Sequence, residues 1–182
     1  MPMLAPYGAF EWLVLTRFGK WNEMLAESEP QEKVPAMHAY YRYARGLAMA
    51  GLGRTKDASA EAERMAAICA RIPEDQTFMI NPVRNVMAVG QAELAAKIAR
   101  ANGDAAAEID ALRKAVEAED KLGYMEPPEW HYPVREALGA ALLRNGKAAE
   151  AEAVFRRDLE INPRNGRSLY GLVEALKAQG NT

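Results

Sequence analysis

The amino-acid sequence predicts an all-α protein in which helices pack in antiparallel pairs. Alanine is abundant and β-branched residues are few, which favours close-packed helices over strands. Apolar residues recur at the three- and four-residue spacing of a helix in successive segments of the chain. A glycine suited to a tight turn follows each of these segments. We therefore expect about four helix pairs, one further helix at the C-terminal end, and almost no strand.

Five glycines mark the expected turns and give the chain its period. Their separations are 34, 50, 43 and 34 residues, so two intervals equal one 34-residue unit and the other two contain insertions of 16 and 9 residues. A glycine suits these points because the chain leaves a helix through a left-handed conformation that a side chain makes costlier. The turn glycines are Gly19, Gly53, Gly103, Gly146 and Gly180.

The expected helices follow one another along the chain, one before and one after each turn. Thr55 and Asp104 stand shortly after two of the turns, where a side-chain oxygen can cap a helix. The last helix, over residues 166–178, has no second helix after it and is expected to act as a cap. Apolar residues place first helices over residues 10–18, 43–50, 94–101, 138–143 and 169–176, and second helices over residues 24–25, 58–69, 109–116 and 151–159.

The clearest unit is the 34-residue segment from Tyr132 to Asn165. Its large apolar residues, glycines, alanine, aromatic residue and final proline stand at the spacing of two helices joined by a tight turn. They are Leu138, Gly139, Leu142, Gly146, Ala151, Phe155 and Pro163. This pattern resembles the tetratricopeptide repeat (TPR) family. The segments FGKWNEML and EPPEWHYPVR also resemble parts of large bacterial TPR proteins, a likeness that implies no activity.

Charged residues interrupt the family pattern at positions where it favours apolar residues, alanine or proline. The unit that starts at Ala39 keeps Gly46, Gly53 and Ala58 but is interrupted twice. The unit around Gly103 departs further. The interrupting residues are Arg135 and Asp158 in the clearest unit, Arg42 and Arg45 in the unit from Ala39, and Glu108 and Asp120 in the unit around Gly103.

The resemblance implies a single α-superhelical domain over residues 1–182, either complete or a fragment of a longer repeat protein. Each pair buries its apolar stripe only against its neighbours, so roughly three or more repeats are needed for stability. The resemblance also implies that first helices line a concave groove that binds a peptide. The candidate groove residues are Tyr40, Tyr43, Glu93, Lys97, Arg100, Glu136, Arg167, Tyr170, Glu174 and Lys177.

This set of tyrosines and charges of both signs suits an extended peptide, because aromatic faces supply contact area and charges fix the register. An ordinary solvated helix face is the alternative for each residue. The chaperone-type clamp for a C-terminal carboxylate is not expected. It requires lysine and asparagine at two positions that Glu93 and Lys97 occupy here.

The insertion that precedes the clearest unit ends in a rigid, aromatic loop, residues 123–135. Pro127 and Pro128 exclude a helix there. One interpretation is a lip beside the groove, and the alternative is that Trp130 and Tyr132 pack between repeats. Arg135 is expected to pair with Glu126 or Glu129. The candidate lip residues are Tyr124, Trp130, His131 and Arg135. The other insertion, residues 72–85, is expected to break the helix and fold over the groove.

The N-terminal helix carries Trp12, Leu13, Val14 and Leu15 in a row, which puts apolar surface on more than one face. Upstream repeats, a second copy of the chain, or the Pro30 to Val34 loop are the alternative covers. Glu11 and Arg17 interrupt the apolar run, so no membrane span is expected, and no signal peptide is recognised. A cytoplasmic location follows as an expectation.

Composition and motifs argue against several functions. The net charge is −2 with 26% charged residues, so no nucleic-acid partner is expected. Cys69 is the single cysteine and lies on an apolar helix face, which indicates a buried structural thiol. A metal site from Glu126, Glu129 and His131 is weighed and not expected, because proline separates the glutamates. No cofactor motif is found.

The sequence therefore predicts a protein-binding or peptide-binding scaffold that uses the concave face and performs no catalysis. Two alternatives stay open. One is a small-ligand pocket formed where the two insertions cover the groove, and the other is self-association through the apolar N-terminal helix. The identity of the partner is not encoded in any motif.

Overall fold

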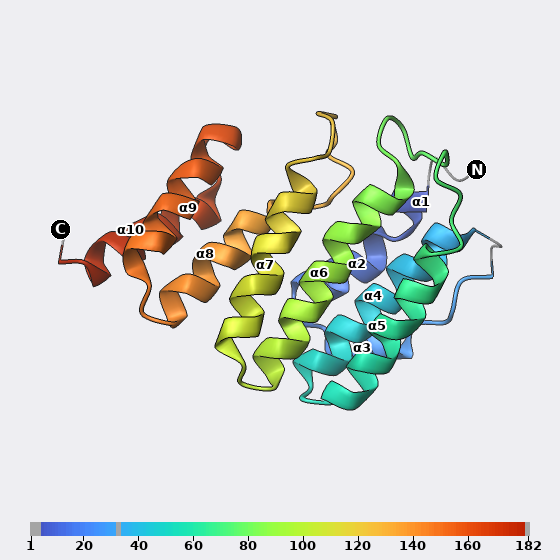
Figure 1. The fold of residues 1–182 in the computed structure, drawn as a ribbon. Helices are drawn as coiled ribbons and strands as arrows, with labels where there is room; N and C mark the ends of the chain where they lie inside the picture. The colour runs from blue at the N-terminus through green and yellow to red at the C-terminus, as the bar shows by residue number, and fades with distance from the viewer. Residues whose placement is uncertain (1–4, 32–33, 181–182) are drawn as a thin grey trace.

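The computed structural model describes residues 5–31 and 34–180 and is all-helical, with a single isolated β-bridge between Thr77 and Pro82 in that part of the chain. The predicted all-α class is confirmed (Figure 1). The helices are α1 (Ala5–Gly8), α2 (Phe10–Arg17), α3 (Trp21–Ala26), α4 (Pro35–Gly51), α5 (Thr55–Cys69), α6 (Val83–Ala101), α7 (Ala105–Glu119), α8 (Val134–Arg144), α9 (Ala148–Ile161) and α10 (Gly166–Ala178).

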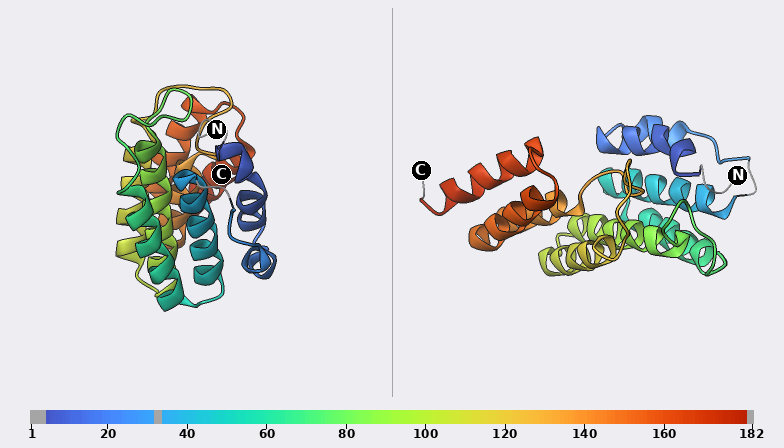
Figure 2. Two further views of the ribbon diagram at one scale, coloured as in Figure 1. Left: turned by 90° about the vertical axis from the view of Figure 1, so that its right-hand side faces the viewer. Right: turned by 90° about the horizontal axis from the view of Figure 1, so that it is seen from above.

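The helices form a row of hairpins packed side by side. The hairpins α4–α5, α6–α7 and α8–α9 follow one another, and α10 packs on α8 and α9 at the end of the row (Figure 1). At the other end, α1, α2 and α3 pack on α4. The right-hand view of Figure 2 shows α1–α3 and α10 on the same side of the row, at its two ends.

The five turn glycines adopt the left-handed conformation that their positions predicted. Their φ angles are 69° at Gly19, 75° at Gly53, 76° at Gly103, 71° at Gly146 and 76° at Gly180. Only glycine enters this region without a steric penalty from a Cβ atom. The cap prediction is confirmed for Asp104, which accepts a hydrogen bond from the Ala107 N–H at 2.9 Å. It is wrong for Thr55, which is the first residue of α5 and makes no cap bond.

Glycines inside the helices allow close approach between neighbouring elements. A Cβ atom on Gly139 of α8 would lie 2.5 Å from ring atoms of Phe155, and one on Gly171 of α10 would lie closer still. The Phe155 ring therefore packs between the backbones of α8 and α10. At Gly90 of α6 a Cβ would lie 2.7 Å from Trp130. These glycines set the spacing of the row.

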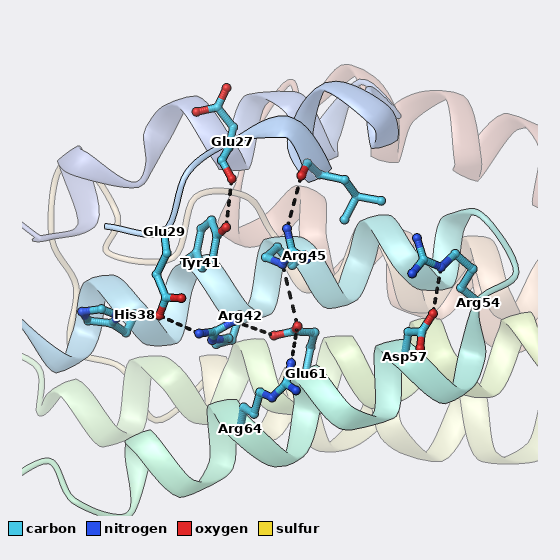
Figure 3. A network of polar contacts seen from close by, with 11 residues as sticks. Glu27, Glu29, His38, Tyr41, Arg42, Arg45, Arg54, Asp57, Glu61 and Arg64 are labelled. Carbon is cyan, nitrogen blue, oxygen red and sulfur yellow. Dashed lines mark hydrogen bonds and ion pairs between the residues drawn. The ribbon is translucent and has the colours of Figure 1, made fainter. Parts of the chain in front are cut away.

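Arg42 and Arg45, which interrupt the apolar pattern of α4, meet a buried carboxylate of α5 (Figure 3). The side chain of Glu61 is 2% exposed. It lies 2.8 Å from Arg64, 3.4 Å from Arg42 and 3.7 Å from Arg45. An ion-pair network thus replaces the apolar contact that the family pattern predicts at this interface.

The same face of α4 holds the segment that follows α3 (Figure 3). The Tyr41 hydroxyl donates to the Glu27 carbonyl at 2.9 Å, and Arg42 lies 2.6 Å from the Glu29 carboxylate. Arg45 donates to the Leu25 carbonyl at 3.3 Å. These bonds fix α3 and residues 27–29 against α4 and so position one end of the groove.

The N-terminal helix α2 buries one face and exposes another. Trp12 and Leu13 are buried, and the Trp12 ring contacts Tyr41 edge-on at 5.2 Å between centroids. An apolar stripe on the opposite side is exposed and is formed by Tyr7, Phe10, Val14 and Phe18. Residues 32 and 33 of the Pro30 to Val34 loop, one of the expected covers, lie outside the described residues.

Candidate binding groove

A groove of about 870 Å³ runs along the side of the row that α1–α3 and α10 border. Helices α2, α3, α4, α6, α7, α8, α9 and α10 and the aromatic loop all contribute to its lining. The apolar part of the lining is formed by Leu47, Ala96, Leu112, Ala137, Ala140, Leu143 and Phe155. The charged and aromatic part is formed by Arg17, Trp21, Tyr43, Glu93, Lys97, Arg100, Glu108, His131, Tyr132, Glu136, Arg144, Arg167, Tyr170 and Glu174.

A buried carboxylate at Glu93 joins α6 to α4 and to the aromatic loop. It accepts hydrogen bonds from the Tyr43 hydroxyl at 2.9 Å, the Trp130 indole N–H at 3.1 Å and the Tyr132 hydroxyl at 2.7 Å. Burial raises the pKa of Glu93 to about 7, although these three donors oppose the rise. Three segments of the chain therefore depend on one side chain beneath the groove.

An ion pair joins α2 to α8 at the groove. Arg17 lies 2.5 Å from the Glu136 carboxylate, and its guanidinium stacks 4.3 Å from the centre of the Tyr132 ring. Glu136 also accepts from the Asn165 amide at 3.1 Å and lies 3.8 Å from Arg167. The N-terminal helices are thus tied to the C-terminal half of the row at this point.

Basic residues dominate the part of the groove between α6 and α8. Arg144 pairs with Glu108 at 2.6 Å. Lys97 places its ammonium 5.0 Å from the centre of the Trp21 ring. Burial lowers the pKa of Lys97, and the charges of Arg100 and Arg144 lower it further. This part of the groove therefore carries an excess of positive charge.

Eight of the ten residues predicted for the groove line it. Tyr40 does not, because it is 1% exposed and its ring lies between Phe78 and Trp130 at centroid distances of 6.2 and 6.3 Å. Lys177 does not line it either, and its ammonium lies 2.9 Å from Glu174. Tyr43 and Glu93 are buried and contribute to the floor of the groove.

The aromatic loop buries Trp130 inside the protein and exposes Tyr124 to solvent. Trp130 is 3% exposed and stacks on Tyr40, so the packing alternative describes it correctly. His131 lines the groove, and burial lowers its pKa to about 3. Tyr124 is 82% exposed but does not line the groove. Of the candidate lip residues, Trp130 and Tyr124 therefore do not line the groove.

The predicted partners of Arg135 are wrong. Its guanidinium lies 2.6 Å from Asp120 and 3.8 Å from Glu119, at the end of α7, and not against the loop glutamates. Glu119 in turn accepts from the Val134 N–H at 3.1 Å. Arg135 therefore fixes the start of α8 to α7.

Glu129 of the aromatic loop joins the two insertions. Its carboxylate accepts from the backbone N–H groups of Met79 at 3.0 Å and Ile80 at 3.3 Å, and from the Asn81 amide at 2.5 Å. Asn81 also exchanges two hydrogen bonds with Gly123, at 2.7 and 3.1 Å. No residue of the other insertion, residues 72–85, lines the groove, so the expectation that this insertion folds over the groove is wrong.

The described residues offer little for other site chemistry. Cys69 is buried, and burial raises the pKa of its thiol to about 11, which keeps it protonated. In residues 5–31 and 34–180, histidine, cysteine, aspartate and glutamate form no group of three that could hold a metal ion. Within the same ranges no helix is both long and apolar enough to cross a membrane.

Several groove residues are not predicted from the sequence. Arg17 and Trp21 come from the N-terminal helices, and Arg17 reaches its partner across 119 residues of sequence. Arg144 and Tyr132 flank predicted positions on α8 and its preceding loop. The four-residue spacing of Glu136, Ala140 and Arg144 on one face of α8 is a usable signal for Arg144. No local pattern identifies Arg17 or Trp21.

A scan against protein-family models, a search of curated proteins and a search of solved structures each found no match to this chain.

Proposed function

We propose that the chain is a TPR-like superhelix whose groove binds a peptide segment of another protein without catalysis. Support for the superhelix comes from the left-handed turn glycines and from the hairpins that pack in sequence order. The cytoplasmic location remains a prediction from the sequence.

The groove itself carries the proposal. Its lining extends from α2 to α10, so a ligand laid along it contacts helices from the whole length of the row. Apolar side chains of Leu47, Leu112 and Leu143 supply contact area, and charged side chains around them fix orientation. This combination suits an extended peptide, which presents alternating side chains and a polar backbone.

Tyr170 gives the sharpest test because it lines the groove and is 69% exposed, so its removal leaves the core intact. Its neighbour Leu169 is also exposed but does not line the groove. A pull-down compares which proteins bind to the wild-type chain, to Tyr170→Ala and to Leu169→Ala. We expect a captured protein that is lost with Tyr170→Ala and kept with Leu169→Ala, and a synthetic peptide from it that competes. Capture that is equal for both variants contradicts the proposal.

A small ligand is a second candidate, since about 870 Å³ falls within the range of roughly 300–1,000 Å³ for ligand pockets. A pocket covered by both insertions, as the sequence suggested, is not proposed, because no residue of 72–85 lines the groove. A saturable thermal shift with a small molecule, abolished by Tyr170→Ala, favours a small ligand over a peptide.

Self-association is a third candidate, because the stripe on α1 and α2 is exposed, with Phe18 at 71%. Its test is sedimentation of the wild type and of Phe18→Ser. A monomer at micromolar concentration for both proteins excludes self-association through this stripe.

A further inference from the structure

The carboxylates that line the groove are matched by donors from the protein itself. Glu136 is bound by Arg17 and Asn165, and Glu108 is bound by Arg144. Glu174 is bound by Lys177 at 2.9 Å. Glu93 accepts three hydrogen bonds beneath the groove. A cationic ligand would have to compete with each of these contacts.

The cations of the groove are not matched in the same way. Lys97, Arg100 and Arg144 surround one part of it, and Glu108 is the carboxylate that this part contains. Glu108 is bound to Arg144, and neither Lys97 nor Arg100 forms an ion pair within the part of the chain that the structure describes. Lys97 and Arg100 lie one turn apart on α6, so a single carboxylate can reach both side chains.

A second excess of positive charge lies at the other side of the groove. Arg17 and Arg167 share the single carboxylate of Glu136, and Arg167 is the more distant of the two at 3.8 Å. Arg167 is 60% exposed at its side chain and is available to a ligand. The groove therefore offers positive charge without a close carboxylate partner at two separate places, on α6 and on α10.

We propose that the groove binds a peptide whose acidic side chains contact Lys97 and Arg100 at one place and Arg167 at another. This inference rests on the proposed peptide-binding function and adds the chemistry of the ligand. Two separate contacts favour internal aspartate or glutamate side chains over one terminal carboxylate. A continuous polyphosphate such as RNA fits less well, because carboxylates, among them Glu136 and Glu174, and apolar side chains also line the groove.

The test uses three pools of fluorescent heptapeptides, acetylated and amidated at their ends. Each pool alternates randomised apolar or aromatic residues with one class of polar residue: aspartate and glutamate, lysine and arginine, or asparagine and glutamine. Binding is measured by fluorescence polarisation against the wild-type chain. A uridine oligonucleotide and an acidic pool with free C-terminal carboxylates are further arms.

The groove variant is the charge reversal Lys97→Glu with Arg100→Glu. Its matched control is Arg71→Glu with Lys114→Glu, which changes the net charge equally at exposed residues that do not line the groove. Circular dichroism and thermal unfolding confirm that both variants fold. We expect binding of the blocked acidic pool, a loss of about tenfold or more in the groove variant, and little change in the control.

The outcomes separate this inference from the function on which it rests. If the chain prefers the basic or neutral pool and Tyr170→Ala abolishes that binding, the peptide-binding function is supported. The inference that the peptide is acidic is then overturned. Binding that requires a free C-terminal carboxylate, or that is stronger for the oligonucleotide, also overturns the inference. If no pool binds, both the function and the inference are contradicted.

Discussion

At the level of single residues, charged side chains that interrupt the apolar pattern of the repeats are paired with oppositely charged side chains of neighbouring segments in several cases. Arg42 and Arg45 meet Glu61, and Arg135 meets Asp120. Glu108, which stands where the family pattern favours alanine, meets Arg144. Each departure thus creates a specific contact between neighbouring helices in place of an apolar one.

Removal of Glu61 tests whether such a contact is needed. Glu61→Ala leaves Arg42, Arg45 and Arg64 around a buried position without a counter-charge. We expect a loss of about 3 kcal/mol in the free energy of unfolding, measured by urea denaturation. The control is Glu63→Ala, two residues away and exposed, with a change within about 0.5 kcal/mol. Equal effects of the two variants would show that the network does not stabilise the fold.

Glu93 gives the protein a predicted pH dependence. Its pKa is about 7 in the folded chain against an ordinary 4.5, so the folded state holds the proton more tightly than the unfolded state. The corresponding stability is fully present below pH 4.5 and is lost as the pH rises through 7. Glu119, with a pKa of about 7, acts in the same direction. His131, with a pKa of about 3, acts in the opposite direction as the pH falls below 6.5.

Glu93→Gln tests the contribution of Glu93, because the variant removes its titration and with it the charge that helps to raise the pKa of Glu119. Urea denaturation of wild type and variant between pH 5 and 8 is the measurement. We expect the free energy of unfolding to fall less with rising pH in Glu93→Gln, by up to about 3 kcal/mol over this range. Parallel pH profiles for the two proteins would mean that Glu93 is not protonated preferentially in the fold.

At the level of elements, the spacing of α8, α9 and α10 depends on glycines that face Phe155. Gly171→Ala puts a Cβ atom into the Phe155 ring, and we expect a loss of about 2 kcal/mol in the free energy of unfolding. Phe155→Leu in the same chain should return part of this loss. The control Gly166→Ala, on the same helix, meets no atom within 4 Å. A Gly171→Ala variant as stable as Gly166→Ala would contradict this packing.

The two insertions are held together by hydrogen bonds of Glu129. Glu129→Ala removes three hydrogen bonds to residues 79–81. We expect thermolysin to cleave the chain within residues 72–82 severalfold faster, while the control Glu126→Ala leaves the rate unchanged. Equal cleavage rates in Glu129→Ala and Glu126→Ala would contradict this role of Glu129.

At the level of the whole molecule, the sequence predicts the row of hairpins better than it predicts the contacts at the ends of the groove. Turn glycines and helical spacing are local signals, and they place the helices. The groove residues are implied by the resemblance to the tetratricopeptide repeat, and eight of the ten line the groove. The ends of the groove depend on long-range contacts such as Arg17 with Glu136, 119 residues apart. Such contacts leave no local pattern, because each partner reads as an ordinary charged residue on a solvated helix face.

Packing also decides between alternatives that the sequence leaves open. Trp130 and Tyr40 are both candidates from the sequence, Trp130 for the lip and Tyr40 for the groove. In the structure both are buried, and their rings stack on each other. Their burial follows from Gly90, which admits the Trp130 ring against α6. The sequence shows the glycine and the aromatic residue, but not that they meet across forty residues of chain.

The central claim is that the groove between α2 and α10 binds a peptide. Amide chemical-shift mapping of the chain during titration with the tightest peptide of the pools tests it most directly. The account predicts that the largest shifts cluster on α6 around Lys97 and Arg100, on α8, and on α10 around Arg167 and Tyr170. Shifts confined to the exposed stripe of Tyr7, Phe10, Val14 and Phe18, or to the outer faces of α5 and α7, would contradict it.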